Sequence, residues 1–207
     1  MHPNPAFHTA SDRDNLTFAR QRAFGVLSVN ADPAPLLSHI PYKLSDDGST
    51  ASLHLVRSNP IVRLLTEPKP AVLAVSGADS YVSPDWYEIP DQVPTWNYVA
   101  VHLRGTLEQR PQDELREVLD QLTDFFETQL APKPVWRTDK MPSDRMDRMM
   151  RMIVPFRLQV TSVDGTWKLA QNKPDNARLS AATHVGRCGI GLEAQLIAAL
   201  MARLPNS

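Results

Sequence analysis

Apolar and polar residues alternate in short runs along much of the chain, and this pattern predicts strands more than helices. The runs that we expect to form strands are 24–29, 35–44, 51–57, 71–75, 97–108 and 153–163. Turn-forming residues such as Asp46–Gly48 separate them, so we expect antiparallel pairing, with the first three strands forming a meander. Asp164–Gly165 is expected to turn the last strand. About six antiparallel strands with tight turns favour a closed or nearly closed β-barrel.

A second periodicity, of three to four residues, predicts helices around this barrel. The segments expected to be helical are 9–22, 111–130, 144–151, 175–183 and 189–203. Ser11 is placed to cap the first of them with Asp14 as its partner, and Asn59–Pro60 marks the start of a short helix. We therefore predict one mainly β domain over residues 1–207 with peripheral helices. It carries a helical insertion at about 111–151 and a C-terminal helix at about 189–203.

Composition narrows the classes of protein that fit. Apolar residues make up 42% and charged residues 22%, which is typical of a globular domain. The net charge of -1 provides no basic excess, so we expect no direct binding of nucleic acid. Cys188 is the single cysteine, and it favours a reducing compartment, the cytoplasm. The first residues lack a signal-peptide pattern, and the apolar runs fall short of the ~18 residues of a membrane span.

Common catalytic and phosphate-binding motifs are missing from the sequence. Only 8 glycines occur, and neither GxGxxG nor GxxxxGK[ST] is found, which argues against a Rossmann site or a P-loop. HExxH, GxSxG and SxxK are also missing. His39 and His54 lie in predicted strands without a third clear ligand, so we expect no metal site. No catalytic residue can be named on these grounds.

Three segments carry unusual polar groups. Ser38-His39-Ile40-Pro41 places polar groups in an apolar strand, and Arg57-Ser58-Asn59-Pro60 joins a strand end to a helix start. A forked cation beside a helix N-terminus can hold a phosphate, although simple capping by Asn59 explains the same residues. Near 93–98, Trp96 could stack on a planar ring and Asn97 could hydrogen-bond its edge. The alternative is that Trp96 fills the core.

Taken in order, these segments resemble the PaiB family of FMN-binding negative transcriptional regulators. The matching stretches are 39–41, 53–60, 81–87, 93–102 and 168–173, of which 93–102 (VPTWNYVAVH) is the most specific. The similarity covers roughly residues 5 to 185. The sequence departs from the family pattern on both sides of Arg57, before Tyr81 and at Ala170, which puts one polar contact with the flavin in question but not the fold.

The resemblance implies the flavin-binding split barrel shared with pyridoxamine-phosphate oxidases. It implies a homodimer with FMN at the subunit interface. The phosphate and ribityl chain would be held by residues of two strands and the turn after them: Ser38, His39, Ile40, Pro41, His54, Arg57, Ser58 and Asn59. Lys168, Gln171 and Asn172 would contribute near the ring or from the partner chain.

Three functions fit this resemblance. The first is a regulator that acts through metabolism or a partner protein, without direct DNA readout. The second is an FMN-dependent oxidoreductase of the flavin-reductase or pyridoxamine-oxidase type, with NADH, NADPH or a small molecule as its partner. The third is a haem-binding barrel, in which His39, His54 and His102 are the candidate axial ligands.

Overall fold

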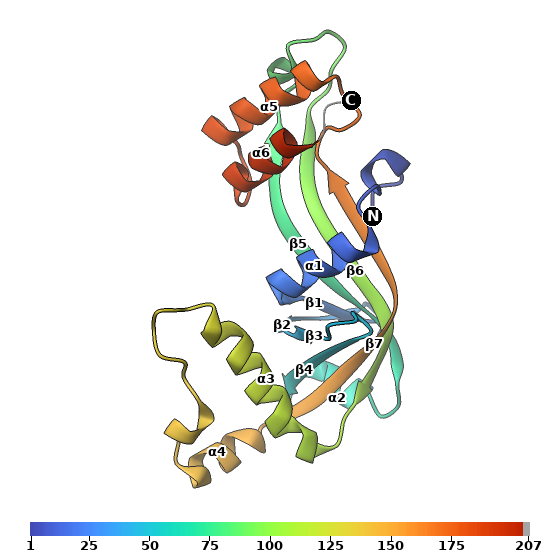
Figure 1. Ribbon diagram of the computed structural model, residues 1–207. Coiled ribbons are helices and arrows are strands. Elements are labelled where there is room, and N and C mark those ends of the chain that lie inside the picture. Colours follow the sequence, from blue (N-terminus) through green and yellow to red (C-terminus); the bar gives the residue numbers. More distant parts are fainter. Residues whose placement is uncertain (205–207) are drawn as a thin grey trace. The chain divides into compact units, whose positions relative to one another are not determined.

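The chain folds into strands flanked by helices, and the computed structural model describes residues 1–204. The strands are β1 (Phe24–Val29), β2 (Leu36–Pro41), β3 (Lys43–Leu44), β4 (Thr50–Val56), β5 (Lys69–Val82), β6 (Thr95–Gln109) and β7 (Ile153–Lys168) (Figure 1). The helices are α1 (Asp12–Arg22), α2 (Pro60–Leu64), α3 (Leu115–Thr128), α4 (Ser143–Met150), α5 (Asp175–Cys188) and α6 (Ala194–Arg203). Within residues 1–204, no helix is long and apolar enough to cross a membrane.

The strands form one seven-stranded, mainly antiparallel sheet in the order β2-β1-β5-β6-β7-β4-β3. Its two edge strands, β2 and β3, are consecutive in the chain and only Tyr42 lies between them. Tyr42 is fully buried, and its hydroxyl donates to the carbonyl of Ala19 at 2.6 Å. Because one bent segment supplies both edges, the sheet curls upon itself as the predicted barrel requires. The predicted fold class is confirmed.

This bend changes two details of the prediction. The expected strand 35–44 is broken at Tyr42 into β2 and β3, which is why the sheet has seven strands rather than about six. The expected three-stranded meander is wrong, because β2 pairs with β1 whereas β3 pairs with β4 at the opposite end of the strand order. Alternation along a sequence locates strands but does not assign their neighbours.

The expected turn at Asp164–Gly165 is also wrong, because β7 continues through it to Lys168. A Cβ atom on Gly165 would lie 2.0 Å from Oδ1 of Asn15. The glycine therefore allows a close approach of a side chain to the strand, and it does not form a turn.

The C-terminal helix begins at Ala194, not at residue 189. Residues 190–192 lie beside β5 without forming a helix: the amide of Tyr81 donates to Ile190 O at 2.7 Å, and that of Asp79 to Leu192 O at 2.9 Å. These bonds give the β5 backbone partners that a helical segment could not supply. The predicted caps of α1 and α2 are confirmed, since Asp14 N donates to Ser11 Oγ at 3.1 Å and Ile61 N to Asn59 Oδ1 at 2.9 Å.

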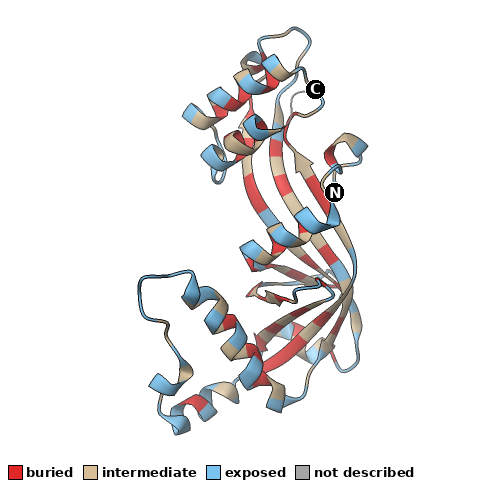
Figure 2. Cartoon of the chain, in the orientation of Figure 1, coloured by how far each residue is buried: buried red, intermediate tan, exposed pale blue. Residues whose placement is uncertain are grey.

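The chain divides into two compact units, a barrel unit and a helical unit. The barrel unit comprises Leu16–Val75 and His102–Val163, and the helical unit comprises Met1–Asn15, Ser76–Val101 and the residues from Asp164 onward. The strands carry bands of buried residues, shown red in Figure 2. In the barrel unit the buried, inward-facing residues include Leu27, Leu44, Leu53, Leu73, Leu103, Leu107, Phe156 and Leu158. In the helical unit α5 and α6 pack together, and Arg178 is 1% exposed between them.

Candidate functional site

A hydrogen bond joins two of the predicted binding segments in the barrel unit. Nδ2 of Asn59 donates to Oγ of Ser38 at 3.2 Å, while Oδ1 of the same amide caps α2 through Ile61 N. The two ends of one side chain therefore fix the start of α2 against β2. The hydroxyl of Ser38 accepts from Asn59 and still has its own proton to donate to a ligand.

Arg57 directly follows the end of β4 and is exposed. Its guanidinium is hydrogen-bonded to a neighbouring segment. Nε donates to Arg151 O at 2.9 Å, and Nη2 donates to Gln112 Oε1 at 3.1 Å. Nη1 adds two further N–H groups that an anion could engage. The side chain is therefore oriented by the segment before β7. Capping of α2 by Asn59 would by itself leave Arg57 freely solvated, which is not the case.

The other predicted residues of these segments differ in exposure. Ser58 is exposed, and its carbonyl accepts from Nη2 of Arg63 at 3.3 Å. His39 is exposed on β2, whereas Ile40 is 3% exposed and belongs to the barrel core. Pro41 is half-buried at the end of β2. Ile40 thus supports the strand from inside, and Ser38 and His39 are the members of this segment with polar groups to offer.

His54 lies on the outer face of β4, because the flanking Leu53 and Leu55 point into the core. Burial lowers the pKa of its imidazole, so the ring is neutral at pH 7. Among the residues that the structure describes, its buried Nδ1 has no hydrogen-bond partner. The ring lines a pocket of about 420 Å³ rich in methionine, and the residues that line this pocket do not include Ser38 or Asn59.

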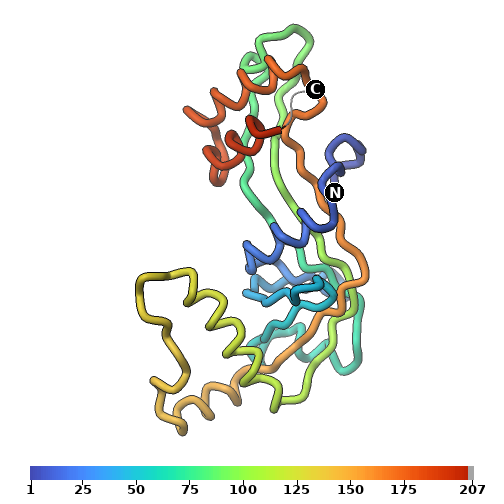
Figure 3. Tube along the Cα trace, in the orientation of Figure 1, coloured from blue at the N-terminus to red at the C-terminus, as the bar shows by residue number. Residues whose placement is uncertain are grey.

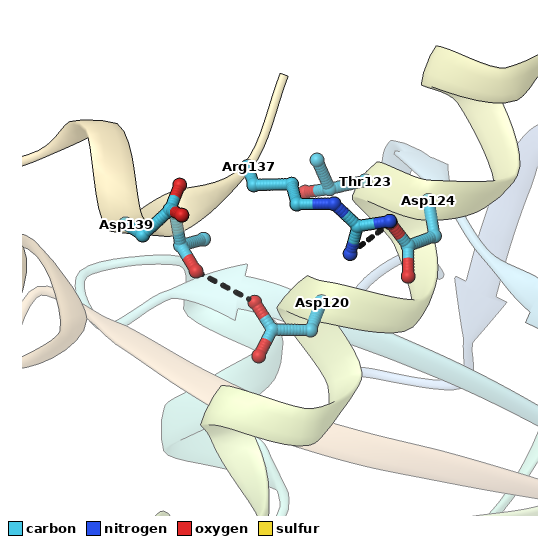
Figure 4. Close-up of a pocket in the computed structure, with 6 residues that line it drawn as sticks. Asp120, Thr123, Asp124, Arg137 and Asp139 are labelled. Atoms are coloured by element: carbon cyan, nitrogen blue, oxygen red, sulfur yellow. Dashed lines mark hydrogen bonds and ion pairs between the residues drawn. The ribbon is translucent and has the colours of Figure 1, made fainter. Parts of the chain in front are cut away.

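After α3 the chain turns back and runs beside this helix towards α4 (Figure 3). A polar pocket of about 310 Å³ lies between this connection and α3, beside the first pocket (Figure 4). Nη1 of Arg137 lies 3.5 Å from Oδ1 of Asp124, and Oγ1 of Thr138 donates to Asp120 at 3.0 Å. These two links attach the connection to the helix. Asp120 and Asp124 therefore have a structural use, and a separate ligand is not needed to explain them.

The remaining predicted residues belong to the helical unit. Trp96 is 47% exposed and meets Tyr81 edge to face, with ring centroids 6.4 Å apart. Asn97 is 1% exposed; its Nδ2 donates to Sδ of Met201 at 3.3 Å, and its Oδ1 has no partner within the described residues. Because side chains alternate along a strand, Asn97 faces the interior with Val99, on the opposite face of β6 from Trp96.

The end of β7 and the turn after it carry the amine of Lys168 and the side-chain amide of Gln171. Lys168 Nζ donates to Oγ1 of Thr95, and burial together with the nearby Lys173 lowers the pKa of the amine. Gln171 folds back on its own turn, where Oε1 accepts from Leu169 N at 2.7 Å and Nε2 donates to Trp167 O. Asn172 is exposed. Gln171 thus shapes the loop, whereas Lys168 is available to a ligand.

Sequence reasoning missed several residues that the structure places beside the predicted ones. Thr95 orients Lys168, and Gln92 accepts from Nζ of Lys173 at 2.6 Å. The methionines of the pocket at His54 were also missed. Their signal was present in the sequence, since Met146, Met149 and Met150 share one helical face by their spacing.

These residues fit a flavin mononucleotide. A phosphate and a polyol need N–H and O–H donors, which Ser38, Ser58 and Nη1 of Arg57 provide. A flavin ring needs an aromatic surface, which the half-exposed Trp96 of the helical unit offers.

Comparison with known proteins gives the same assignment. A family model described as "Putative FMN-binding domain" matches residues 1–162. The chain is 27% identical over 169 residues to "Protease synthase and sporulation protein PAI 2" of Bacillus subtilis, covering 81% of this chain and 80% of that protein. It is 34% identical over 96 residues to an uncharacterized yeast protein of Saccharomyces cerevisiae, covering 42% of this chain and 57% of that protein.

Solved structures with a similar fold include two mycobacterial proteins. An FAD and heme binding protein from Mycobacterium smegmatis superposes with a TM-score of 0.55 at 20% identity, covering 89% of this chain and 82% of that one. A conserved hypothetical protein from Mycobacterium tuberculosis gives a TM-score of 0.56 at 16% identity, covering 82% and 92%. At these identities the likeness concerns the fold.

Proposed function

The chain belongs to the FMN-binding family whose model matches residues 1–162, as its resemblance to PaiB predicted, and from this premise we propose that it binds FMN as a homodimer. FMN is the cofactor that the family description names. When bound, it supplies hydride and electron transfer. The observation that carries the proposal is the Asn59–Ser38 link, which holds the donors of β2 beside the start of α2.

Within the barrel unit we assign the phosphate and ribityl chain to Ser38, Arg57 and Ser58. Asn59 acts on them as a positioning residue, because its own amide is used by Ser38 and by α2. For the ring we favour Trp96 and Lys168, whereas Asn97 is buried on the opposite face of β6 from Trp96. Ile40 and Gln171 serve the fold of their segments.

The biological role that we propose is regulation without direct DNA readout, in the cytoplasm. A net charge of -1 offers no electrostatic attraction to phosphate backbones. The flavin would report a metabolic state, and a partner protein or a metabolic product would carry the signal. Anisotropy of a labelled DNA duplex at low salt tests this part: no binding is expected, and salt-dependent binding would contradict it.

FMN binding is tested by titrating flavin-free full-length protein with FMN, following the quenching of flavin fluorescence. Light scattering on the same samples measures the mass of the assembly. We expect one FMN per chain in a dimer, and an affinity about tenfold weaker in Arg57→Met, since one charge-assisted contact is removed. Arg148→Met changes an exposed arginine of α4 and serves as the control. No bound FMN at excess flavin contradicts the proposal.

One observation favours a second candidate, an FMN-dependent oxidoreductase. The pKa of the Lys168 amine is lowered by burial, so it can exchange a proton more readily near neutral pH than an ordinary lysine. Oxidation of NADPH or NADH in air by the flavin-loaded protein tests this candidate. Turnover that Lys168→Met reduces, with FMN still bound, supports the enzyme; bound flavin that neither nucleotide bleaches supports the regulator.

A further inference from the structure

The helical insertion of the barrel unit has both of its ends beside Arg57. This insertion joins β6 to β7 and contains α3 and α4. Gln112 lies near its start, and Met150 and Arg151 lie near its end, where α4 stops. The backbone amide of Arg57 donates to Met152 O at 2.8 Å, which fixes the chain after β4 against the end of the insertion.

One side chain joins the two ends of the insertion to each other and to Arg57. Nε2 of Gln112 donates to Met150 O and to Ile153 O, both at 3.1 Å. Its Oε1 accepts from Nη2 of Arg57, also at 3.1 Å. An amide suits this place because it has two N–H donors and one acceptor, so it can bind carbonyl groups and a guanidinium together. Both polar atoms of the Gln112 side chain are therefore used within the protein.

The groups that orient the guanidinium of Arg57 are all neutral. Nε donates to Arg151 O at 2.9 Å, and Nη2 donates to Ile153 O at 3.4 Å as well as to Gln112. Carbonyl groups at the end of a helix carry a partial negative charge, which attracts a cation without cancelling its unit charge. Among the residues that the structure describes, no carboxylate hydrogen-bonds to Arg57. The guanidinium is thus held in one orientation and keeps its charge for an anion.

This orientation is in place before a ligand arrives. Nε and Nη2 share one edge of the planar guanidinium, and Nη1 with its two N–H groups lies off that edge. Fixing a long side chain on a ligand costs conformational entropy when the side chain is mobile beforehand. Because Gln112 and the carbonyl groups already hold Arg57, most of this cost arises in folding and not in binding.

We propose that Gln112 is a positioning residue for the flavin phosphate and that it acts through Arg57. It connects the two ends of the helical insertion and orients the guanidinium, and it does not contact the phosphate itself. The inference rests on the proposed function, because Arg57 is the arginine assigned there to the phosphate of FMN. It also gives the insertion a part in the flavin site, since both of its ends orient this arginine.

The test compares FMN with riboflavin, which has the same ring and ribityl chain but no phosphate. Both flavins are titrated into the full-length protein, and the quenching of flavin fluorescence gives the two affinities. In Gln112→Ala we expect the affinity for FMN to fall about fivefold, the cost of ordering one long side chain, while that for riboflavin stays unchanged. Gln121→Ala, at an exposed glutamine of α3 that bonds to Glu117, is the control and should change neither affinity.

Two further variants separate orientation from a general structural effect. Gln112→Glu places a carboxylate beside Arg57, so the affinity for FMN should fall further than in Gln112→Ala while riboflavin binds as before. In the Arg57→Met background, Gln112→Ala should have no additional effect on FMN, because the residue through which it acts is gone. Circular dichroism of each variant confirms that it is folded before the affinities are compared.

Three results would overturn the inference while the proposed function stands. An unchanged affinity for FMN in Gln112→Ala would show that Arg57 does not need this contact. Equal losses for FMN and riboflavin would indicate a distorted barrel and not a misplaced guanidinium. The same loss of FMN affinity with and without Arg57 would mean that Gln112 acts by another route. Failure of the wild type to bind FMN would instead contradict the proposed function, and the inference with it.

Discussion

The amide of Asn59 is bonded at both ends, to the hydroxyl of Ser38 at 3.2 Å through Nδ2 and to the first turn of α2 through Oδ1. This arrangement allows the cap and the link to β2 to be separated by mutation. Asn59→Asp keeps the acceptor that caps α2, but it replaces the donor to Ser38 by an oxygen and adds a negative charge. Asn59→Ala removes both bonds.

We expect Asn59→Ala to lower the free energy of unfolding by about 1 kcal/mol, the usual cost of a lost N-cap. Asn59→Asp should lose less stability, yet its affinity for FMN should fall at least about tenfold, because a carboxylate repels the phosphate. Urea unfolding and flavin titration measure the two quantities. If Asn59→Asp bound FMN as tightly as the wild type, the phosphate would not lie at this helix start.

Gly165 lies against the side chain of Asn15, which accepts a hydrogen bond from Nε1 of Trp167 at 2.8 Å. A Cβ atom there would be 2.0 Å from Asn15 Oδ1, so Gly165→Ala must displace Asn15 and break this bond. We expect a loss of about 2 kcal/mol, typical of overpacking a close contact. Thermal or urea unfolding of the purified variant gives the value.

Two comparisons make this expectation specific. Gly186→Ala, inside α5, brings its Cβ no closer than 3.4 Å to Ala198, and it should be neutral or stabilising by up to about 1 kcal/mol through helix propensity. Asn15→Ala removes the obstacle, so Gly165→Ala should cost much less in that background. Additive losses in the double variant would argue against the close approach as the cause.

Arg178 is a buried arginine whose bonds fasten the C-terminal helix. Its Nη1 donates to Met201 O, and its Nη2 donates to Leu204 O at 3.4 Å and to Asp175 Oδ1 at 2.8 Å. Arg178→Met leaves these acceptors without their donor and should lower the free energy of unfolding by about 3 kcal/mol. Arg187→Met, on the exposed part of the same helix, should cost less than about 0.5 kcal/mol. Equal losses for the two would refute this role.

The sequence predicted local structure better than it predicted neighbours. The caps at Ser11 and Asn59 involve contacts within three residues, and both were predicted correctly. The break at Tyr42 and the continuation of β7 through Gly165 depend on Ala19 and Asn15, which lie far away in the sequence. Turn propensity cannot distinguish a glycine that bends the chain from one that admits a neighbouring side chain.

The candidate site shows the same difference between local features and contacts that join distant parts of the sequence. The polar residues at 38–41 and 57–59 could be selected from the sequence because polar groups are unusual at a strand and at a strand end. The burial of His54 could not, because it depends on which face of β4 the residue occupies and on the helices that cover that face. The pocket at His54 arises from the packing of α4 and its preceding connection, which periodicity alone describes as an ordinary amphipathic helix.

His54 also makes stability depend on pH in a defined direction. Burial holds the pKa of its imidazole in the folded protein below the ordinary value of 6.5 that applies in the unfolded chain. As the pH falls below 6.5, the unfolded state therefore takes up a proton that the folded state does not. The free energy of unfolding should decrease from that pH downward, until the folded imidazole itself is protonated.

Urea unfolding at a series of pH values from about 5 to about 7.5 measures this contribution, since the slope reports the difference in bound protons. His54→Phe should reduce the slope below pH 6.5 by up to one proton, while Val56→Phe, on the same face of β4, should retain the slope of the wild type. A slope that His54→Phe leaves unchanged would show that the ring is protonated as easily in the folded protein as in the unfolded chain.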